Sequence, residues 1–171
     1  PAAPAAAPAS SAAPATSANP PSLPPVFARE HVAPPLPFPP TSLRGISEKL
    51  IRSHYDNNYV GALKTLHAVR ARLSEMLVDR DTPPWAYDDL KREALLRRGS
   101  VVLHELYFAN LGGNGQADAA MRSRIAADFG SFDTWENEFR RMGAGLGGGS
   151  GWVMLGFDAL HGGLENHWLG D

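Results

Sequence analysis

A long run of apolar residues at helical spacing is the feature that most constrains the fold of this chain. Beyond Leu50 these residues recur every three or four positions through Leu77, which is the pattern of an amphipathic helix. The segment Asp81-Thr82-Pro83-Pro84 ends this helix, because neither proline can donate a helical hydrogen bond. A second helix is predicted over about residues 88–111, before the glycine-rich stretch 112–115. Two helices joined by a short turn predict an antiparallel hairpin.

Capping residues and glycines mark the ends and weak points of these helices. Ser47 suits the N-cap of the first helix, with Glu48 in the first turn, where the helix dipole favours an anion. Gly61 marks a position for a kink in the first helix, and Gly99 marks a position for a break in the second.

The remainder of the chain changes from helices to strands. A third helix is predicted over about residues 117–129, and Ser131 with Asp133 caps a fourth that runs to about Met142. Glycines then lead into a predicted strand over 152–157, a turn at His161-Gly162-Gly163 and a returning strand over 164–169. The predicted fold class is α+β: an antiparallel helical hairpin, further helices and the start of an antiparallel β-sheet.

Composition divides the chain into three predicted parts. Residues 1–40 are mostly Pro, Ala and Ser, which cannot bury enough apolar surface to offset ordering, so we expect a disordered linker. Residues 41–115 form the helical hairpin domain, and residues 116–171 begin an α/β domain that is expected to be incomplete. A tether rich in Pro and Ala is compatible with export, so a cytoplasmic and a periplasmic location both stay open.

Charge and cysteine content exclude several classes of function. The formal net charge is −2 with scattered basic residues, which argues against nucleic acid as a partner. No apolar run reaches the length of a membrane span. Cysteine is absent, so a metal must be held by histidines and carboxylates.

Two of the six histidines stand out by their surroundings. His54 and His104 each lie among apolar and aromatic neighbours in the middle of a predicted helix, whereas His31, in the linker, is expected to be solvated. In an antiparallel hairpin these two could face each other, with ring nitrogens about 3 to 4.5 Å apart if both bind one ion. The alternative is a pair of core histidines with satisfied hydrogen bonds.

Four segments resemble the iron/manganese superoxide dismutase family. The stretch from Ser47 to His54 resembles the start of the family's first helix, and Leu103-His104-Glu105-Leu106-Tyr107-Phe108 resembles its Asn-His-Thr-Phe-Tyr-Trp segment. Phe129-Gly130-Ser131-Phe132 and Gly149-Ser150-Gly151-Trp152 match two further family motifs. All four occur in the family's order between Ser47 and Trp152.

The resemblance implies a bacterial oxidoreductase, an antioxidant enzyme that converts superoxide to dioxygen and hydrogen peroxide. It implies one iron or manganese ion per chain, with His54 and His104 as its first two ligands. Tyr107 and Trp152 would form the wall of the site, and Asn58 and Tyr59 would lie around the ligands. A homodimer is also implied.

Some positions depart from the family pattern. Asn58 stands where the family usually has a histidine, and Ala62 stands where it has the gateway tyrosine. Tyr59 could supply a hydroxyl in its place, but it lies about 60° further round the helix than that position. Ser100 stands where iron enzymes carry a glutamine near the metal-bound solvent. These departures leave the choice between iron and manganese open.

The family's other two ligands lie in an Asp-x-Trp-Glu-His-Ala-Tyr segment after a third strand, and this sequence contains no such segment. We therefore expect a fragment that is inactive alone, because two imidazoles bind a divalent ion weakly. The alternative function is a metal-free binding scaffold with the same fold. A His-Glu-x-x-His site, as in a metallohydrolase, is excluded, because His104 has no second histidine four residues earlier or later.

Overall fold

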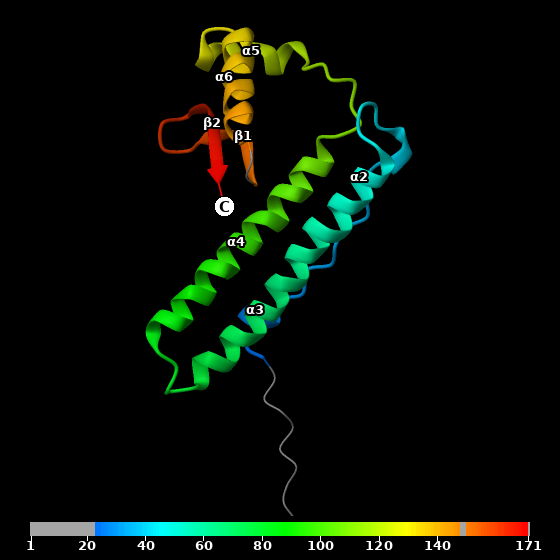
Figure 1. Cartoon of the computed structure of the whole chain (residues 1–171). Helices are drawn as coiled ribbons and strands as arrows, with labels where there is room; N and C mark the ends of the chain where they lie inside the picture. Colours follow the sequence, from blue (N-terminus) through cyan, green and yellow to red (C-terminus); the bar gives the residue numbers. More distant parts are fainter. Residues whose placement is uncertain (1–22, 148–149, 171) are drawn as a thin grey trace, which may run out of the picture.

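The computed structural model describes residues 23–147 and 150–170 (Figure 1). Helices come first and a two-stranded antiparallel sheet follows, so the predicted α+β fold class is confirmed. The elements are, in order, α1 (Pro25–Ala28), η1 (Pro40–Ser42), α2 (Glu48–Ser53), η2 (His54–Tyr59), α3 (Val60–Val78), α4 (Pro84–Ala109), α5 (Ala119–Phe129), α6 (Phe132–Gly145), β1 (Gly151–Asp158) and β2 (Gly163–Gly170).

The first long helix is one segment, α2–η2–α3, with a π-helical turn in it. Ser47 caps its start as predicted, with its hydroxyl accepting a 3.2 Å hydrogen bond from the backbone N–H of Leu50. The irregularity lies at η2, His54–Tyr59, and not at the kink expected near Gly61. A π-helical turn widens the backbone from the i+4 to the i+5 hydrogen-bonding pattern, and such turns are frequent at functional sites.

The second long helix, α4, is longer than predicted. It begins at Pro84, four residues before the predicted start, because a proline is tolerated in the first turn, where its missing N–H has no helical partner. It continues through Gly99 without the expected break. Helices α3 and α4 lie side by side and antiparallel (Figure 1), and Leu63, Leu66 and Phe108 are buried between them.

The segment that precedes α2 is attached to this hairpin. Residues 23–40 contain the short helix α1, and Leu36 and Phe38 pack against the hairpin core. The Tyr55 hydroxyl also donates a 2.7 Å hydrogen bond to the Pro34 carbonyl. The expectation of a disordered linker with few contacts is therefore wrong for residues 23–40, because composition does not reveal a tertiary partner. Residues 1–22 lie outside the described residues.

The remaining elements form a small unit beside α4 (Figure 1). Ser131 caps α6 as predicted, accepting a 3.0 Å hydrogen bond from the Thr134 N–H. Strands β1 and β2 pair in antiparallel register, with Trp152 opposite Leu169. The connecting turn contains Gly162 at φ +79°, a left-handed conformation that favours glycine. Within the two described ranges, no helix has both the length and the apolar character needed to cross a bilayer.

Candidate metal centre

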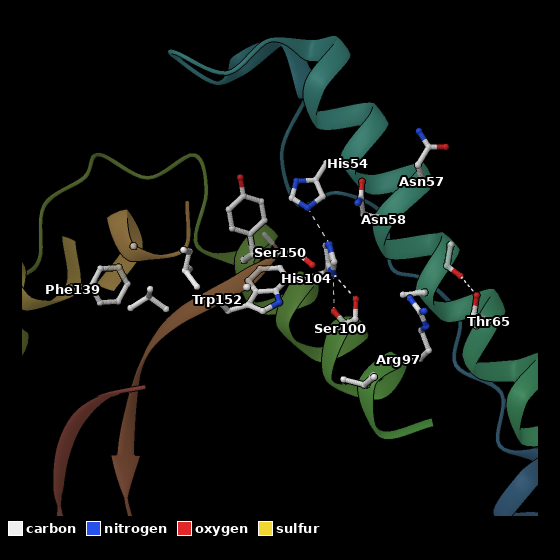
Figure 2. Close-up of a pocket in the computed structure, with 18 of the residues that line it drawn as sticks. His54, Asn57, Asn58, Thr65, Arg97, Ser100, His104, Phe139, Ser150 and Trp152 are labelled. Atoms are coloured by element: carbon white, nitrogen blue, oxygen red, sulfur yellow. Dashed lines mark hydrogen bonds between the residues drawn. The ribbon is translucent and has the colours of Figure 1, made fainter. Parts of the chain in front are cut away.

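His54 and His104 face each other across the two long helices (Figure 2). His54 is the first residue of the π-helical turn η2, and His104 lies in α4. Their Nε2 atoms are 3.0 Å apart, and the two rings meet edge to face at 86°. This distance falls within the range expected for two ligands of one ion.

The carbonyl of Ser100 fixes the tautomer of His104. Nδ1 of His104 lies 2.7 Å from this carbonyl, which can only accept, so Nδ1 carries the proton and Nε2 keeps a free lone pair. The Ser100 hydroxyl is further away, 3.3 Å from the same nitrogen. A metal-binding histidine commonly uses its second nitrogen to donate to a carbonyl in this way.

Both imidazoles are held in the neutral form that binds metal. His104 is only 5% exposed, and burial lowers its pKa, although the hydrogen bond to Ser100 acts in the opposite direction. Burial also lowers the pKa of His54, and the nearby His104 lowers it further. Without a metal, a neutral His54 can donate from Nε2 to the lone pair of His104.

The geometry of the pair fits a shared first-row metal ion. For metal–nitrogen bonds of about 2.1 Å, a 3.0 Å separation of the nitrogens corresponds to a nitrogen–metal–nitrogen angle of about 90°. Imidazole nitrogen is a ligand that iron accepts readily. Within residues 23–147 and 150–170, no group of three or more His, Asp or Glu side chains is arranged to hold an ion. Among the described residues the pair therefore offers an ion two protein ligands.

Two aromatic residues predicted as the site wall lie beside the pair. The Trp152 ring, from β1, is 4.8 Å from that of His104, and the Tyr107 ring is 5.3 Å from that of His54. All four side chains line one cavity between the helical hairpin and the α6–β1 pair. Such rings limit the access of water to the face they cover.

The two remaining predicted site residues, Asn58 and Tyr59, lie in different surroundings: Asn58 lines the cavity and Tyr59 does not. Asn58 is exposed and lines the same cavity as the histidines, as does the buried Ala62. Tyr59 is buried and directs its hydroxyl to Glu105, at 2.6 Å, so it does not replace the gateway tyrosine in that cavity. Burial, and then the bond to Glu105, raise the pKa of Tyr59 and keep its hydroxyl protonated.

Sequence reasoning missed the Glu105 contacts of Tyr59 and His31. The Nε2 atom of His31, which was expected to be solvated, lies 2.5 Å from Oε1 of Glu105. The sequence did hold a sign that Glu105 has a special role, because this ionisable residue follows His104 at a position where the family segment has threonine. The identity of its partners depended on the docking of the N-terminal segment.

Two long helices bring the imidazole pair together and strand β1 covers one side of it, and imidazole nitrogens of this kind suit a first-row metal ion. The sequence profile described as "Iron/manganese superoxide dismutases, C-terminal domain" matches residues 117–171.

Curated relatives extend the match over the helical hairpin. The chain is 49% identical over 138 residues to "Superoxide dismutase [Fe]" of Cupriavidus metallidurans, covering 80% of this chain and 69% of the relative. It is 32% identical over 139 residues to "Superoxide dismutase [Fe]" of Aquifex aeolicus, covering 75% and 64%. It is 29% identical over 136 residues to "Superoxide dismutase [Mn] 2" of Haloferax volcanii, covering 77% and 65%.

The chain therefore belongs to the iron/manganese superoxide dismutase family, as its four motifs predicted. It spans about two thirds of the length of these relatives.

Proposed function

We propose that this protein converts superoxide to dioxygen and hydrogen peroxide at one iron or manganese ion, with His54 and His104 as two of the ligands. The observation that carries the proposal is the convergence of two neutral Nε2 atoms at 3.0 Å in a partly buried, aromatic-walled cavity. Relatives named as iron and as manganese superoxide dismutases support both metals as candidates.

Iron or manganese would supply one-electron redox chemistry, by which one superoxide loses an electron to become dioxygen and a second gains an electron and two protons to become hydrogen peroxide. His54 and His104 would hold the ion, and the residues around them would shield it. The Ser100 carbonyl keeps the Nε2 lone pair of His104 directed at His54. Trp152 and Tyr107 exclude water from one side of the pair, which affects the potential of a bound metal.

Two further ligands, an aspartate and a histidine, are implied by the resemblance and have no counterpart in these 171 residues. We infer that the 171-residue chain alone binds a divalent metal weakly and dismutates superoxide poorly, because two imidazoles give little affinity. We also propose that the functional protein is a homodimer, as the family resemblance implies.

The experiment that tests this proposal uses the protein expressed from its whole reading frame. We expect about one iron or manganese ion per chain by mass spectrometry of the metal, together with superoxide consumption. His54→Ala and His104→Ala should each abolish both. The control is His161→Ala, which removes an exposed imidazole from the β1–β2 turn and should leave both intact. Sedimentation of the same protein tests the dimer.

A metal-free binding scaffold is the second candidate, favoured by the departures at Asn58, Ala62 and Ser100. Ala62 brings no hydroxyl into the cavity, and the Ser100 hydroxyl lies against His104 itself. If the whole protein is well folded, inactive and free of metal, and both alanine variants change only its stability, the scaffold replaces the enzyme.

A further inference from the structure

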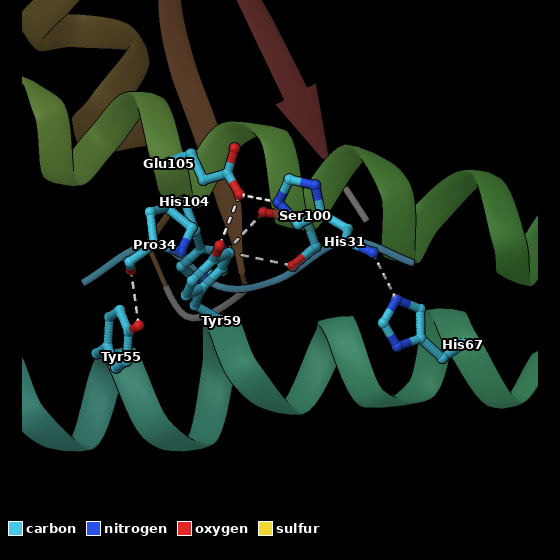
Figure 3. Close-up of polar contacts among 8 residues, drawn as sticks. All are labelled: His31, Pro34, Tyr55, Tyr59, His67, Ser100, His104 and Glu105. Atoms are coloured by element: carbon cyan, nitrogen blue, oxygen red, sulfur yellow. Dashed lines mark hydrogen bonds and ion pairs between the residues drawn. The ribbon is translucent and has the colours of Figure 1, made fainter. Parts of the chain in front are cut away.

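One carboxylate oxygen of Glu105 joins three parts of the molecule (Figure 3). Oε1 accepts a 2.6 Å hydrogen bond from the Tyr59 hydroxyl in η2 and lies 2.5 Å from Nε2 of His31 in the N-terminal segment. Glu105 itself belongs to α4. The π-helical turn, the second long helix and the segment before α2 are therefore connected at one atom.

These contacts lie next to the proposed ligands in the sequence. Glu105 directly follows His104, and Tyr59 is the last residue of the π-helical turn that begins with His54. The Tyr59 hydroxyl thus connects the two backbone segments that carry the histidine pair. Its ring also packs near the pair, with its centroid 6.1 Å from that of His104.

The hydrogen bond between Tyr59 and Glu105 holds the end of the π-helical turn in place. The i+5 hydrogen-bonding pattern of the turn changes the directions in which its side chains project from the helix. The direction of the His54 ring therefore depends on how η2 is held in place. Tyr59 is 1% exposed, and its hydroxyl is held by a carboxylate, which makes a stronger hydrogen bond than a neutral acceptor. A fixed Tyr59 fixes the end of the turn.

His31 attaches the N-terminal segment to both long helices. Its backbone N–H donates a 3.3 Å hydrogen bond to Nε2 of His67 on α3, while its ring contacts Glu105 on α4. The same segment is held to the hairpin by the bond from Arg70 to the Arg29 carbonyl, at 3.0 Å. The N-terminal segment therefore contacts both α3 and α4, and His31 and Tyr59 share one oxygen of the Glu105 carboxylate.

We infer that Tyr59, Glu105 and His31 are positioning residues that hold His54 and His104 at the distance of two ligands of one ion. This inference rests on the proposed metal site. It differs from a purely stabilising role, which would change the free energy of unfolding without changing the geometry of the pair.

The first test is Ni²⁺ binding to the 171-residue chain by calorimetry. The part of the binding that His104→Ala removes is assigned to the histidine pair. Tyr59→Phe should raise the Kd of that part about tenfold, the lower end of the loss seen when residues that orient a metal ligand are removed. Glu105→Leu should act similarly, and Glu105→Gln, which keeps an acceptor oxygen, should recover part of the affinity.

Tyr55→Phe is the matched control. It also removes a hydroxyl from η2 and a hydrogen bond to the N-terminal segment, namely the bond to Pro34, but it does not touch Glu105. Its Ni²⁺ Kd should stay at the value of the unmodified chain. Equal Kd values for the Tyr59→Phe and Tyr55→Phe variants would overturn the positioning role and leave the proposed function standing.

A second readout needs no metal. The ¹⁵N chemical shifts of the His54 and His104 rings report their tautomers and hydrogen bonds, and we expect them to change in Tyr59→Phe but not in Tyr55→Phe. Unchanged ring shifts in Tyr59→Phe overturn the inference even if Ni²⁺ does not bind the pair. If Ni²⁺ does not bind the pair but the ring shifts change in Tyr59→Phe, the positioning role is supported. That result would count against His54 and His104 as metal ligands.

Discussion

Nε2 of His54 and Nε2 of His104 lie 3.0 Å apart, although 50 residues separate the two histidines in the chain. Each sits on a different helix of the hairpin, and both pKa values are lowered, with burial as the larger cause. A proton on either ring would bring a positive charge into this partly buried pair. The metal-free protein should therefore become less stable when the pair is protonated.

The stability of the metal-free chain should depend on pH through this pair. The unfolded chain binds protons at the ordinary histidine pKa of 6.5, whereas the folded chain binds them only at lower pH. The contribution is complete above 6.5 and is lost as the pH falls through 6.5 toward the folded pKa values. Urea midpoints between about pH 5 and pH 8 measure this, and His104→Gln should give a shallower slope. Parallel slopes would argue against it.

The N-terminal segment should contribute to the stability of the hairpin. Phe38 packs against the hairpin core, so Phe38→Ala should lower the free energy of unfolding by about 2 kcal/mol. Val32, in the same segment, is 82% exposed, and Val32→Ala should change the free energy by less than about 0.5 kcal/mol. Urea unfolding measures both. Equal effects of the two substitutions would contradict the docking of this segment.

Much of the fold was predictable because its helices carry local signals. The spacing of Tyr59, Leu66 and Leu73 follows a helical period, and the capping hydroxyls of Ser47 and Ser131 are used as expected. The facing of His54 and His104 followed from two antiparallel helices.

The remaining features depend on tertiary contacts or on helix geometry that periodicity does not resolve. Leu36 and Phe38 are two large apolar residues in a Pro-rich stretch, and only the hairpin core gives them a place to pack. The π-helical turn, His54–Tyr59, adds one residue to a turn without a proline or glycine to mark it. The Glu105 contacts depend on both of these features.

A buried amide should hold the sheet to α6. Asn166 on β2 accepts a 2.9 Å hydrogen bond from Nε1 of Trp135 and donates a 2.8 Å hydrogen bond to Glu138. Asn166→Ala leaves the half-buried indole N–H without its acceptor, so the free energy of unfolding should fall by about 1–3 kcal/mol. The control is Asn137→Ala, an exposed asparagine on α6, which should not destabilise the protein. The same loss in both variants would show that this amide has no special role.

The last prediction concerns self-association of the 171-residue chain through its β-hairpin. The described sheet has two strands, so each strand has an edge with unpaired backbone groups, and Trp168 on β2 is 58% exposed. An exposed aromatic side chain on an edge strand favours pairing with a second chain. Trp168→Lys should shift the chain toward the monomer, because a charged lysine on an edge strand opposes pairing. Trp85→Lys is the control, since Trp85 is 68% exposed but lies at the start of α4, away from any strand edge. Sedimentation velocity over a range of concentrations measures the outcome, and an equal shift in both variants would assign association to exposed tryptophan in general and not to the strand edge.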